Sequence, residues 1–589
     1  MSSASPPAIT GKQRWLLPET DPVRTAELAA SAALPALIAQ LLLNRGVANA
    51  QDAERFLHPK LDDLLDPYSM FGMTAAVARV QAAIRGCELI LIYGDYDVDG
   101  TTAVVLLKTA IERLGGKVRF HVPHRLREGY GMQGSVLESA FIEGVRLVIS
   151  VDTGIRAFAE AKVAERLGLD LIVTDHHLPE AALELPRALV ILNPNQSGCE
   201  YGCKHLCGAG VAFKLAQALL EADDRERTRA KILPSFLKLL VLATVADSVP
   251  LLGENRVIAS LGLQELQRPV GVGLRALMEQ ANLDPAQRPL TTVDIGFRLA
   301  PRINAAGRMD VASDVVELFT TRDRGRAAEL AAKLERLNAE RRQTELAALE
   351  EIERRLVEDH SLREAHCIVI DQEDWHRGVI GILASRLVDR TARPAIVIAI
   401  EDGQAFGSGR SVPGFHLLEA LESCAELFAR FGGHAHAVGF SLPADRIPEL
   451  RERLETYACR HLEPGMPIRT VECHSALAFD CLTPEIYGWL RQLEPFGMGN
   501  PEPTFLARDV RIATERRVMK ERHLRLALEG GPGDRNIAAV GWNWAERAAQ
   551  MGLVKGSVVN IAYHLRQNDH PDFGGLELEI VGLELAEAE

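Results

Sequence analysis

The chain has 589 residues, which is too long for a single hydrophobic core and predicts several domains. Its composition, 47% hydrophobic and 25% charged, is ordinary for a soluble globular protein, and no apolar run is long enough to span a bilayer. The net charge of −14 argues against general affinity for nucleic acids, although it leaves room for a local basic groove. Nine scattered cysteines and a start without a secretory signal favour reduced thiols, a cytoplasmic location and no membrane association.

Residues 1–70 predict a helical lead-in without recognisable chemistry, with a helix over Pro35–Leu43 and a turn at His58–Pro59. From about 80 to 250, apolar β-branched strands alternate with helical patterns. This alternation predicts an α/β fold with a parallel sheet covered by helices. The expected strands are Leu89–Tyr93, Val118–Val122, Leu147–Val151, Leu171–Thr174 and Leu189–Leu192, and the expected helices include Thr101–Leu114 and Ile155–Leu167.

Acidic residues and a histidine pair gather at the ends of these strands. Ligands of a parallel sheet bind beyond the carboxyl ends of its strands, where such residues would meet. Along the chain they are Asp95, Asp97 and Asp99 after the first strand, Asp152 after Leu147–Val151, Asp175 with His176 and His177 after Leu171–Thr174, and Asp247 after the apolar segment Leu237–Ala246.

The crowding of these carboxylates needs an explanation, because two charges about 4 Å apart repel by about 4 kcal/mol at an effective dielectric constant near 20. Asp and His without cysteine suit Mn²⁺ or Mg²⁺ better than structural zinc. Two cations sharing one bridging carboxylate would suit phosphoryl chemistry. For one aspartate, a turn or helix cap is the better interpretation, but six carboxylates and a histidine pair at successive strand ends favour a metal site.

The second half of the chain predicts a different organisation. Residues 250–325 are mixed and helical, and 324–358 form a long charged helix, a stiff connector with leucines such as Leu330 and Leu346 on its apolar side. A smaller αβ unit follows, with strands Cys367–Ile370 and Ala395–Ile400 around a helix at about 379–389. It contains two Gly-rich segments expected to be turns, and short alternating runs after about 465 predict a small antiparallel barrel. The expected domains are 1–70, 71–323, 324–358, 359–464 and 465–589, and the turns are Gly407–Ser411 and Phe431–His434.

Several motifs resemble those of one family. The four segments Gly94–Gly100, Val151–Gly154, Thr174–His177 and Ala246–Pro250 resemble the motifs of the DHH phosphoesterase superfamily, in order. Gly378–Arg386, Ser408–Ser411 and Gly432–His434 resemble its associated DHHA1 domain, and Glu494–Pro501 resembles the entry to a C-terminal OB domain. The resemblance implies a parallel-sheet DHH domain, a connector, a DHHA1 domain and an OB-like barrel. It also implies a metal-dependent exonuclease that degrades single-stranded DNA from 5′ to 3′ in recombination and repair, including mismatch repair.

The resemblance assigns roles to the strand-end residues. Asp97 and Asp152 would hold one of two Mn²⁺ or Mg²⁺ ions, and Asp152 would bridge to the second. The second ion would be held by Asp99, Asp152, His176 and Asp247, while His177 would face the scissile phosphate and Asp175 would support the histidines. Asp95 would be a ligand or support one, because Tyr93 stands where several family members place a histidine.

Substrate contacts are expected outside the metal ligands. The resemblance places Ser408, Arg410, Ser411, Gly433 and His434 on a DHHA1 surface that faces the site. Arg125 is a candidate for the terminal phosphate, and Asn304 and Arg308 are candidate strand contacts; a solvated or ion-paired surface role is the alternative for both arginines.

The predicted barrel carries a basic stretch, residues 508–525, with seven Lys or Arg against three acids. It could line a groove for a single strand, or it could be merely a charged β surface. Phe505, Trp542, Trp544 and Tyr563 could stack on bases, but core packing is expected for most of them. The spacing of Cys199, Cys203 and Cys207 departs from zinc knuckles, so no zinc site is expected there.

Two other functions remain open at this stage. One is a DHH–DHHA1 phosphodiesterase for short oligonucleotides or cyclic dinucleotides, which the extra barrel argues against. The other is a DNA-binding protein that has lost its metals, which the complete set of Asp and His residues argues against. We expect a monomer that acts on single-stranded DNA, with a single-strand-binding protein and a RecQ-type helicase as candidate partners.

Overall fold

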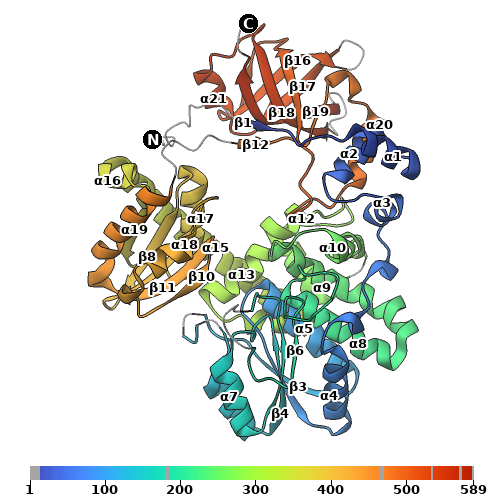
Figure 1. Cartoon of the computed structure of the whole chain (residues 1–589), viewed down its shortest axis with the longest axis vertical. Helices are drawn as coiled ribbons and strands as arrows, with labels where there is room; N and C mark the ends of the chain where they lie inside the picture. Colours follow the sequence, from blue (N-terminus) through green and yellow to red (C-terminus); the bar gives the residue numbers. More distant parts are fainter. Residues whose placement is uncertain are drawn as a thin grey trace.

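The computed structural model describes residues 14–586 except for 126, 130, 180–184, 269, 463–469, 532–534 and 569–573. It contains three bodies (Figure 1): one built on a parallel sheet at the bottom, a second αβ body at the left and a β-barrel at the top. The long helix α15, Arg324–Glu358, has the predicted bounds and links the first body to the second.

The first body is built on five parallel strands, as predicted, and their order is β3-β2-β4-β5-β6. The strands are β2 Leu89–Tyr93, β3 Lys117–His121, β4 Val145–Val151, β5 Asp170–Thr174 and β6 Val190–Leu192. Alternate strand residues point to opposite faces of the sheet, and on both faces they are apolar. Helices therefore cover both faces and bury these side chains. One face packs on α4 Met73–Arg85, α5 Val98–Arg113 and α8 Gly208–Arg227, and the other on α6 Gly134–Ile142 and α7 Phe158–Leu167.

The strand order reverses between β2 and β4. From β2 the chain passes to β3 at one edge, then returns past β2 to add β4, β5 and β6 on the other side. Loops that leave a parallel sheet at such a switch point diverge and open a crevice at the carboxyl ends of the strands. The aspartates that follow β2 and β4 therefore meet in one crevice.

A helical extension continues the first body. It contains α9 Leu233–Ala246, α10 Gly253–Glu265, α11 Val272–Gln280, α12 Thr292–Asp294, α13 Ala300–Met309 and α14 Ser313–Thr320. Asp247 was expected with the other acids at strand ends, but it caps the C-terminus of helix α9. A continuous apolar run fits a buried helix as well as a strand, so its periodicity could not decide between them.

Helix α15 is more than a connector, because its apolar side packs into one hydrophobic core in its first half and into another in its second half. Leu330 and Leu334 pack in the helical extension, and Leu349 and Ile352 pack in the core of the second body. Leu346, predicted on the apolar side, is instead 56% exposed. It lies in the stretch where the helix passes from one core to the other.

The second body contains a five-stranded sheet in the order β10-β11-β9-β8-β7. Its elements are α16 His360–Glu364, β7 Ile368–Glu373, α17 Ile380–Thr391, β8 Ala395–Glu401, β9 Gln404–Arg410, α18 Leu417–Glu422, β10 Arg430–His434, β11 Ala437–Pro443 and α19 Ile447–His461. Both Gly-rich segments predicted as turns lie mainly in strands, β9 and β10. Their glycines allow close packing: a Cβ atom on Gly407 would lie 2.0 Å from Cζ of Phe440 on β11.

The C-terminal barrel has strands in the order β13-β14-β18-β19-β17-β16-β15, and an antiparallel bridge between Ile512 and Leu528 joins the end of β14 to β16. Its elements are β12 Thr470–Glu472, β13 Ser475–Ala476, α20 Pro484–Gln492, β14 Phe505–Arg511, β15 Arg517–Met519, β16 His523–Gly531, β17 Arg535–Gly541, α21 Ala545–Gln550, β18 Val558–Asn568 and β19 Gly575–Leu585. The predicted barrel is present, but the pairs β13–β14 and β17–β19 are parallel, so it is not purely antiparallel.

The N-terminal helices share a core with this barrel. Strand β1, Arg14–Leu16, pairs in parallel with β12, and Leu28 and Ile38 lie in one hydrophobic cluster with Phe505 and Tyr563. The helices of this segment are α1 Pro22–Ala32, α2 Ala36–Leu43 and α3 Ala50–Leu57. The lead-in is therefore packed against the far end of the chain.

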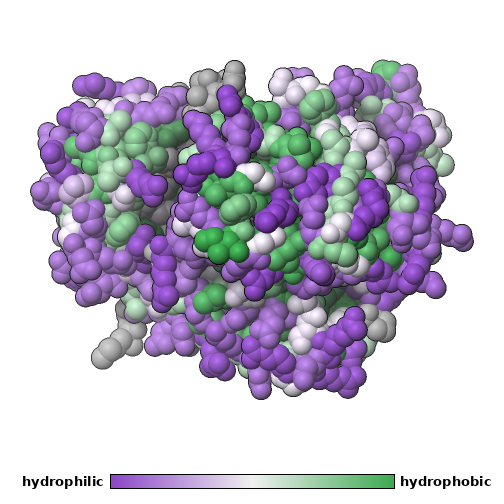
Figure 2. All heavy atoms as spheres, turned by 90° about the horizontal axis from the view of Figure 1, so that it is seen from below, coloured by the Kyte–Doolittle hydropathy of each residue, from purple (hydrophilic) through white to green (hydrophobic). Residues whose placement is uncertain are grey.

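The face of the molecule seen from below is mostly hydrophilic. Seen from below (Figure 2), polar side chains cover most of the rim and hydrophobic ones gather in patches toward the middle. In the part of the chain that the structure describes, no single helix has the length and apolar character to cross a membrane. Helices α1 and α2 meet that test only as a pair, which is bent by 113°.

Candidate metal centre

The loop between β2 and α5 holds its aspartates in fixed positions. Asp97 caps α5, because its Oδ1 accepts a hydrogen bond from the backbone N–H of Gly100 at 3.0 Å. The carboxylate of Asp99 accepts the N–H groups of Gly208 and Ala209, at 2.6 and 2.8 Å, in the first turn of α8. Helix N-termini favour negative charge, so these contacts hold both carboxylates where the helix dipoles attract them.

Two further carboxylates belong to Asp152, which is buried, and to Asp247, whose side chain is 26% exposed. Asp152 follows β4 directly with a left-handed φ of 60°. Within the described residues, neither its Oδ1 nor the Oδ2 of Asp247 has a hydrogen-bond partner. A Cβ atom on Gly208 would lie 2.3 Å from that Oδ1, so glycine at the start of α8 makes room for the carboxylate. Buried unpaired oxygens are unfavourable unless they bind a proton or a cation.

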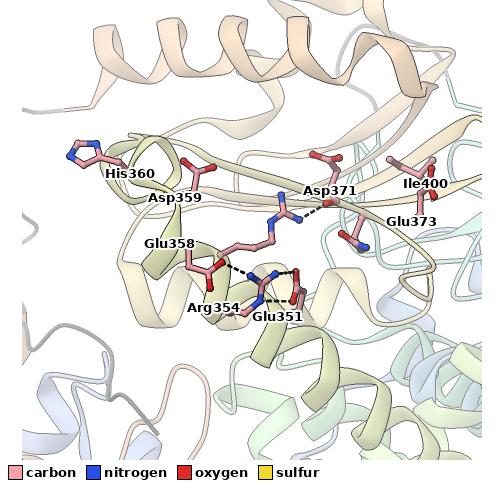
Figure 3. Close-up of a pocket in the computed structure, with 10 residues that line it drawn as sticks. Glu351, Arg354, Glu358, Asp359, His360, Asp371, Glu373 and Ile400 are labelled. Atoms are coloured by element: carbon pink, nitrogen blue, oxygen red, sulfur yellow. Dashed lines mark hydrogen bonds and ion pairs between the residues drawn. The ribbon is translucent and has the colours of Figure 1, made fainter.

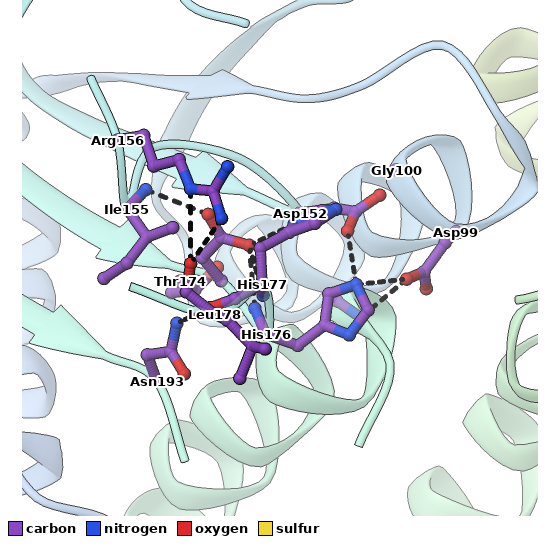
Figure 4. A network of polar contacts seen from close by, with 12 residues as sticks. Asp99, Gly100, Asp152, Ile155, Arg156, Thr174, His176, His177, Leu178 and Asn193 are labelled. Atoms are coloured by element: carbon purple, nitrogen blue, oxygen red, sulfur yellow. Dashed lines mark hydrogen bonds and ion pairs between the residues drawn. The ribbon is translucent and has the colours of Figure 1, made fainter. Parts of the chain in front are cut away.

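His176 lies between these carboxylates. Its Nε2 is 3.3 Å from Oδ1 of Asp152 and 3.8 Å from Oδ2 of both Asp99 and Asp247. Figure 4 shows its ring between Asp99 and Asp152. Burial lowers the pKa of His176, which favours the neutral ring that binds metals.

The neighbouring His177 is oriented by Asp175. Nδ1 of His177 lies 2.7 Å from Oδ1 of Asp175, and the same carboxylate accepts the backbone N–H of Ile155 at 2.9 Å. Burial alone would lower the pKa of His177, but the hydrogen bond to Asp175 and its charge raise that pKa to about 9. His177 therefore holds a proton at neutral pH when no cation is close.

The potential ligands form two separate groups of three, and a third group shares members with both. One contains Asp95, Asp97 and Asp152, and the other contains Asp99, His176 and Asp247; in each group the ligand atoms lie within 4.8 Å of one another. A third group, Asp152, His176 and His177, overlaps both. Carboxylate oxygens with one imidazole nitrogen are suitable ligands for Mn²⁺ or Mg²⁺. Asp95, whose role was open, lies inside the first group.

The protonation states of the carboxyl groups point to a cation site. Burial, and then repulsion from neighbouring carboxylates, raise the pKa of Asp95 and of Asp247 to about 8. The same causes raise the pKa of Asp97, and raise that of Asp152 well above its usual range. A divalent cation would replace these protons and remove the repulsion.

A polar cavity of about 380 Å³ opens over the ligands and lies between the first and second bodies. Asp99 does not line it, but Asp95, Asp97, Asp152, Asp247 and both histidines do, together with Tyr96, Arg125, Asn304, Gly307, Arg308 and Arg410 of the second body. The guanidinium of Arg125 lies 5.1 Å from the centre of the Tyr96 ring. The structure thus brings four predicted substrate residues to one cavity with the metal ligands.

Two of these residues also have structural contacts. Oδ1 of Asn304 accepts the backbone N–H of Val98 at 3.1 Å, so it holds the aspartate loop. Nη1 of Arg308 donates to the carbonyl of Gly378 at 3.0 Å, and thereby joins α13 to the second body. Burial lowers the pKa of Arg308 to about 10. Neither is an exposed surface residue, and their contact with a DNA strand stays a prediction.

The other predicted contacts of the second body do not line this cavity. They are Ser408, Ser411, Gly433 and His434. Oγ of Ser411 donates to the carbonyl of Phe415 at 2.7 Å, and a Cβ atom on Gly433 would lie 2.2 Å from the carbonyl oxygen of Ala437. These contacts give both residues a role in the local fold, and contact with substrate remains a prediction for all four.

The barrel offers one exposed aromatic residue near its basic stretch. Phe505, Trp544 and Tyr563 lie in the hydrophobic core, as expected for most of the four aromatics. Trp542 is 54% exposed and packs edge-on against His523 of β16. It is therefore the one of the four that is placed to stack on a base.

A larger cavity, of about 780 Å³, lies elsewhere and contains none of the predicted site residues. It is formed between the end of α15 and strands β7 and β8. Figure 3 shows Arg354 between Glu351 and Glu358, with which it forms ion pairs, and Arg355 donates to the carbonyl of Asp371. Glu351 and Glu358 are thus paired with Arg354, and among the described residues no group of three potential metal ligands lines this cavity.

Sequence reasoning missed several residues that shape the site. The N–H groups of Gly208 and Ala209 bind Asp99, and a Cβ atom on Gly307 would lie 2.3 Å from the carbonyl oxygen of Tyr96. In the sequence, the only hint of these contacts was a glycine at the start of α8 (Gly208) and another inside α13 (Gly307). A glycine indicates that another segment can approach closely, but it does not reveal which one.

Comparison with known proteins places these features in a family. The model of the DHH family N-terminal domain matches residues 89–244, the DHHA1 domain matches 364–458, and the RecJ OB domain matches 473–581. Together the three matches cover the parallel-sheet body, the second body and the barrel.

Full-length relatives show the same similarity. The chain is 39% identical to the single-stranded-DNA-specific exonuclease RecJ of Bacillus subtilis, over 95% of this chain and 69% of the relative. It is 40% identical to the protein of that name in Dickeya dadantii, over 86% of this chain and 90% of the relative. The crystal structure of RecJ from Thermus thermophilus with Mn²⁺ aligns with a TM-score of 0.82 and 32% identity, over 98% of this chain and 80% of that chain.

Proposed function

The chain belongs to the RecJ family, and from this premise we propose that it is a single-stranded-DNA-specific exonuclease that releases mononucleotides from the 5′ end. Strand specificity follows from the relatives of that name. Polarity and products follow from the motifs that resemble DHH exonucleases. A role in recombination and repair, including mismatch repair, follows from this activity.

The observation that carries the proposal is the position of Asp152. It belongs to the ligand group of Asp95 and Asp97, and its Oδ1 lies 3.3 Å from Nε2 of His176 in the second group. One carboxylate can therefore serve two cations. Crystal structures of the Thermus thermophilus relative are described with Mn²⁺ and with Mg²⁺. We propose that this chain binds two ions of either metal.

The ligand sets follow from the two groups. Asp95, Asp97 and Asp152 would hold one cation, and Asp99, Asp152, His176 and Asp247 would hold the other. Two divalent cations held by these residues would supply an activated water nucleophile and would neutralise charge on the phosphate. Asp175 keeps Nδ1 of His177 occupied, so the rest of that ring can face the cavity and donate to a phosphate oxygen.

The arginines around the cavity would hold the strand end. Arg125 and Arg410 approach it from the first and the second body, and both provide donors for phosphate oxygens. The barrel would hold the strand farther from the site, through its basic stretch and the exposed Trp542.

The remaining features of the proposal concern the cellular setting. Single-stranded DNA is the proposed substrate, and a single-strand-binding protein or a RecQ-type helicase would supply it. We propose a monomer acting where the DNA is, in the cytoplasm. These statements rest on the family and on the substrate.

Digestion of end-labelled DNA tests the proposal. Oligonucleotides labelled at the 5′ or the 3′ end, single- or double-stranded, are incubated with the full chain and Mn²⁺ or Mg²⁺. We expect the 5′ label to appear at once as a mononucleotide from single strands, and the 3′ label to remain on a shortening ladder. Cleavage of dinucleotides alone would instead favour a short-oligonucleotide phosphodiesterase, and binding without cleavage would favour a non-catalytic DNA-binding protein.

A further inference from the structure

A cluster of potential metal ligands lies outside the proposed active site. His366 stands just before β7, and Glu455 and Cys459 lie one turn apart on α19. Nδ1 of His366 is 2.7 Å from Oε1 of Glu455 and 3.2 Å from Sγ of Cys459, and this Sγ is 3.6 Å from the same Oε1. The three ligand atoms therefore face a common point.

The separations suit a small tetrahedral cation. Bonds of about 2.0–2.2 Å from zinc to nitrogen or oxygen, and of about 2.3 Å to sulfur, imply ligand separations of roughly 3.3–3.6 Å. The two separations that involve Sγ, 3.2 and 3.6 Å, are already in or near this range. Only the hydrogen-bonded pair of His366 and Glu455, at 2.7 Å, must open by about half an ångström.

The carboxylate of the cluster is held in place by the backbone. Both oxygens of Glu455 accept the N–H of His366, at 3.0 and 2.9 Å, and Oε2 accepts the N–H of Cys367 at 3.1 Å. Burial would raise the pKa of Glu455, but these hydrogen bonds lower it overall, so the carboxylate is ionised. Such bonds behind a ligand orient it for a metal.

We propose that His366, Glu455 and Cys459 form a second metal site, for Zn²⁺ or a similar divalent cation. One charge on the carboxylate and one on the thiolate balance such a cation, and the neutral imidazole completes a mixed set of nitrogen, oxygen and sulfur ligands typical of zinc. Binding converts the thiol of Cys459 to a thiolate, forms the metal–sulfur bond and releases one proton to solvent. Water takes the fourth position, since the side chain of His366 is 51% exposed.

The role of this site would be structural. His366 stands where the chain enters the second body, and Cys459 lies in its last helix, so the cation would join the two ends of this body. Figure 1 shows α19 at the left edge of that body, on the side of β8 away from α13. The site is thus separate from the cavity that carries the proposed catalytic ligands.

Cobalt binding tests the proposal directly. Co²⁺ is added to the full chain carrying Asp97→Asn and Asp152→Asn, which weaken the carboxylate site, and to the same protein with Cys459→Ser or Cys481→Ser. Cys481 is a matched control because it is also exposed and unbridged. We expect a cobalt–thiolate charge-transfer band that Cys459→Ser removes and Cys481→Ser retains. The absence of the band, or its persistence in Cys459→Ser, would overturn the proposal.

A measurement on the unmodified chain avoids dependence on folding of the variants. Iodoacetamide labelling followed by peptide mass analysis is compared with and without Zn²⁺. We expect Zn²⁺ to slow the alkylation of Cys459 at least tenfold and to leave Cys481 unchanged. Equal labelling of Cys459 under both conditions contradicts the site, whatever the outcome of the DNA digestion.

Discussion

Nδ1 of His177 and Oδ1 of Asp175 lie 2.7 Å apart, and Asp175 also accepts backbone N–H groups from both histidines of the motif and from Ile155. The carboxylate therefore acts through His177 and the loop, without belonging to either ligand group. It fixes which side of the His177 ring faces the cavity. We treat Asp175 as a positioning residue.

Replacing Asp175 with Asn should lower kcat about 10- to 100-fold, the usual effect of losing a support behind such a residue. The loss of charge should also lower the pKa of His177, which Asp175 raises to about 9 when no cation is close. Because the protonated ring is lost as pH rises through this pKa, the alkaline limb of the kcat profile should move to lower pH. Steady-state rates between pH 6 and 10 would show the shift.

Asp170→Asn is the matched control, because Asp170 lies at the opposite end of β5 and pairs with Arg79. Its pH profile should follow the unchanged protein. An Asp175→Asn profile identical to that of the control would show that the carboxylate does not act through His177.

Binding of Mn²⁺ should release protons at neutral pH. The pKa values of Asp95 and Asp247 are raised to about 8, so these carboxyl groups hold protons until a cation replaces them. Affinity for Mn²⁺ should therefore rise as pH increases from 6 to 8 and level off above that range. Calorimetry in buffers of different ionisation enthalpy measures the number of protons released, and a value of zero at pH 7 would contradict these protonation states.

Arg125→Gln should weaken the binding of DNA strands that carry a 5′-phosphate. A charge-assisted hydrogen bond contributes about 1.5–3 kcal/mol, so KM should rise roughly 10- to 100-fold while kcat changes little. Strands ending in a 5′-hydroxyl should be affected much less. An equal loss on both substrates would assign Arg125 to the site in general and remove it from the terminal phosphate.

Arg256→Met should loosen the joint between the first body and the barrel. The buried guanidinium donates to the carbonyls of Phe56, Leu493 and Glu494, at 2.6, 3.0 and 2.9 Å, so the substitution leaves several carbonyls unpaired. We expect a loss of at least about 3 kcal/mol in the free energy of unfolding. Urea unfolding, with the exposed Arg275→Met of α11 as control, would measure it, and equal midpoints would contradict this role.

The sequence predicted the parts of the site that depend on local periodicity. Five apolar strands and the helices between them indicated a parallel sheet, and parallel strands bring residues such as Asp97 and Asp152 to one edge. The number of residues between these two aspartates did not matter, because the order of the strands in the sheet decides which carboxyl ends lie side by side. The same reasoning misassigned the residues before Asp247, since a buried helix and a buried strand are both continuously apolar.

Contacts between distant segments were beyond such reasoning. Nothing local in residues 14–57 shows that they pack against β14 and β18, or that Arg256 binds carbonyls at the entry to the barrel. Gly407, Gly409 and Gly433 indicated turns, but the structure shows that they pack closely on β11, a contact with another strand that local sequence does not reveal. His366 and Cys459 meet only because α19 folds back on β7.

Asp152 would join two cation sites in one crevice. Anomalous diffraction from crystals of the full chain soaked in Mn²⁺ is the decisive test of this bridging role. We expect two peaks about 3.5–4 Å apart, on either side of the Asp152 carboxylate. One peak should lie near Asp95 and Asp97, and the other near Asp99, His176 and Asp247. A single peak, or peaks that do not contact Asp152, would contradict it.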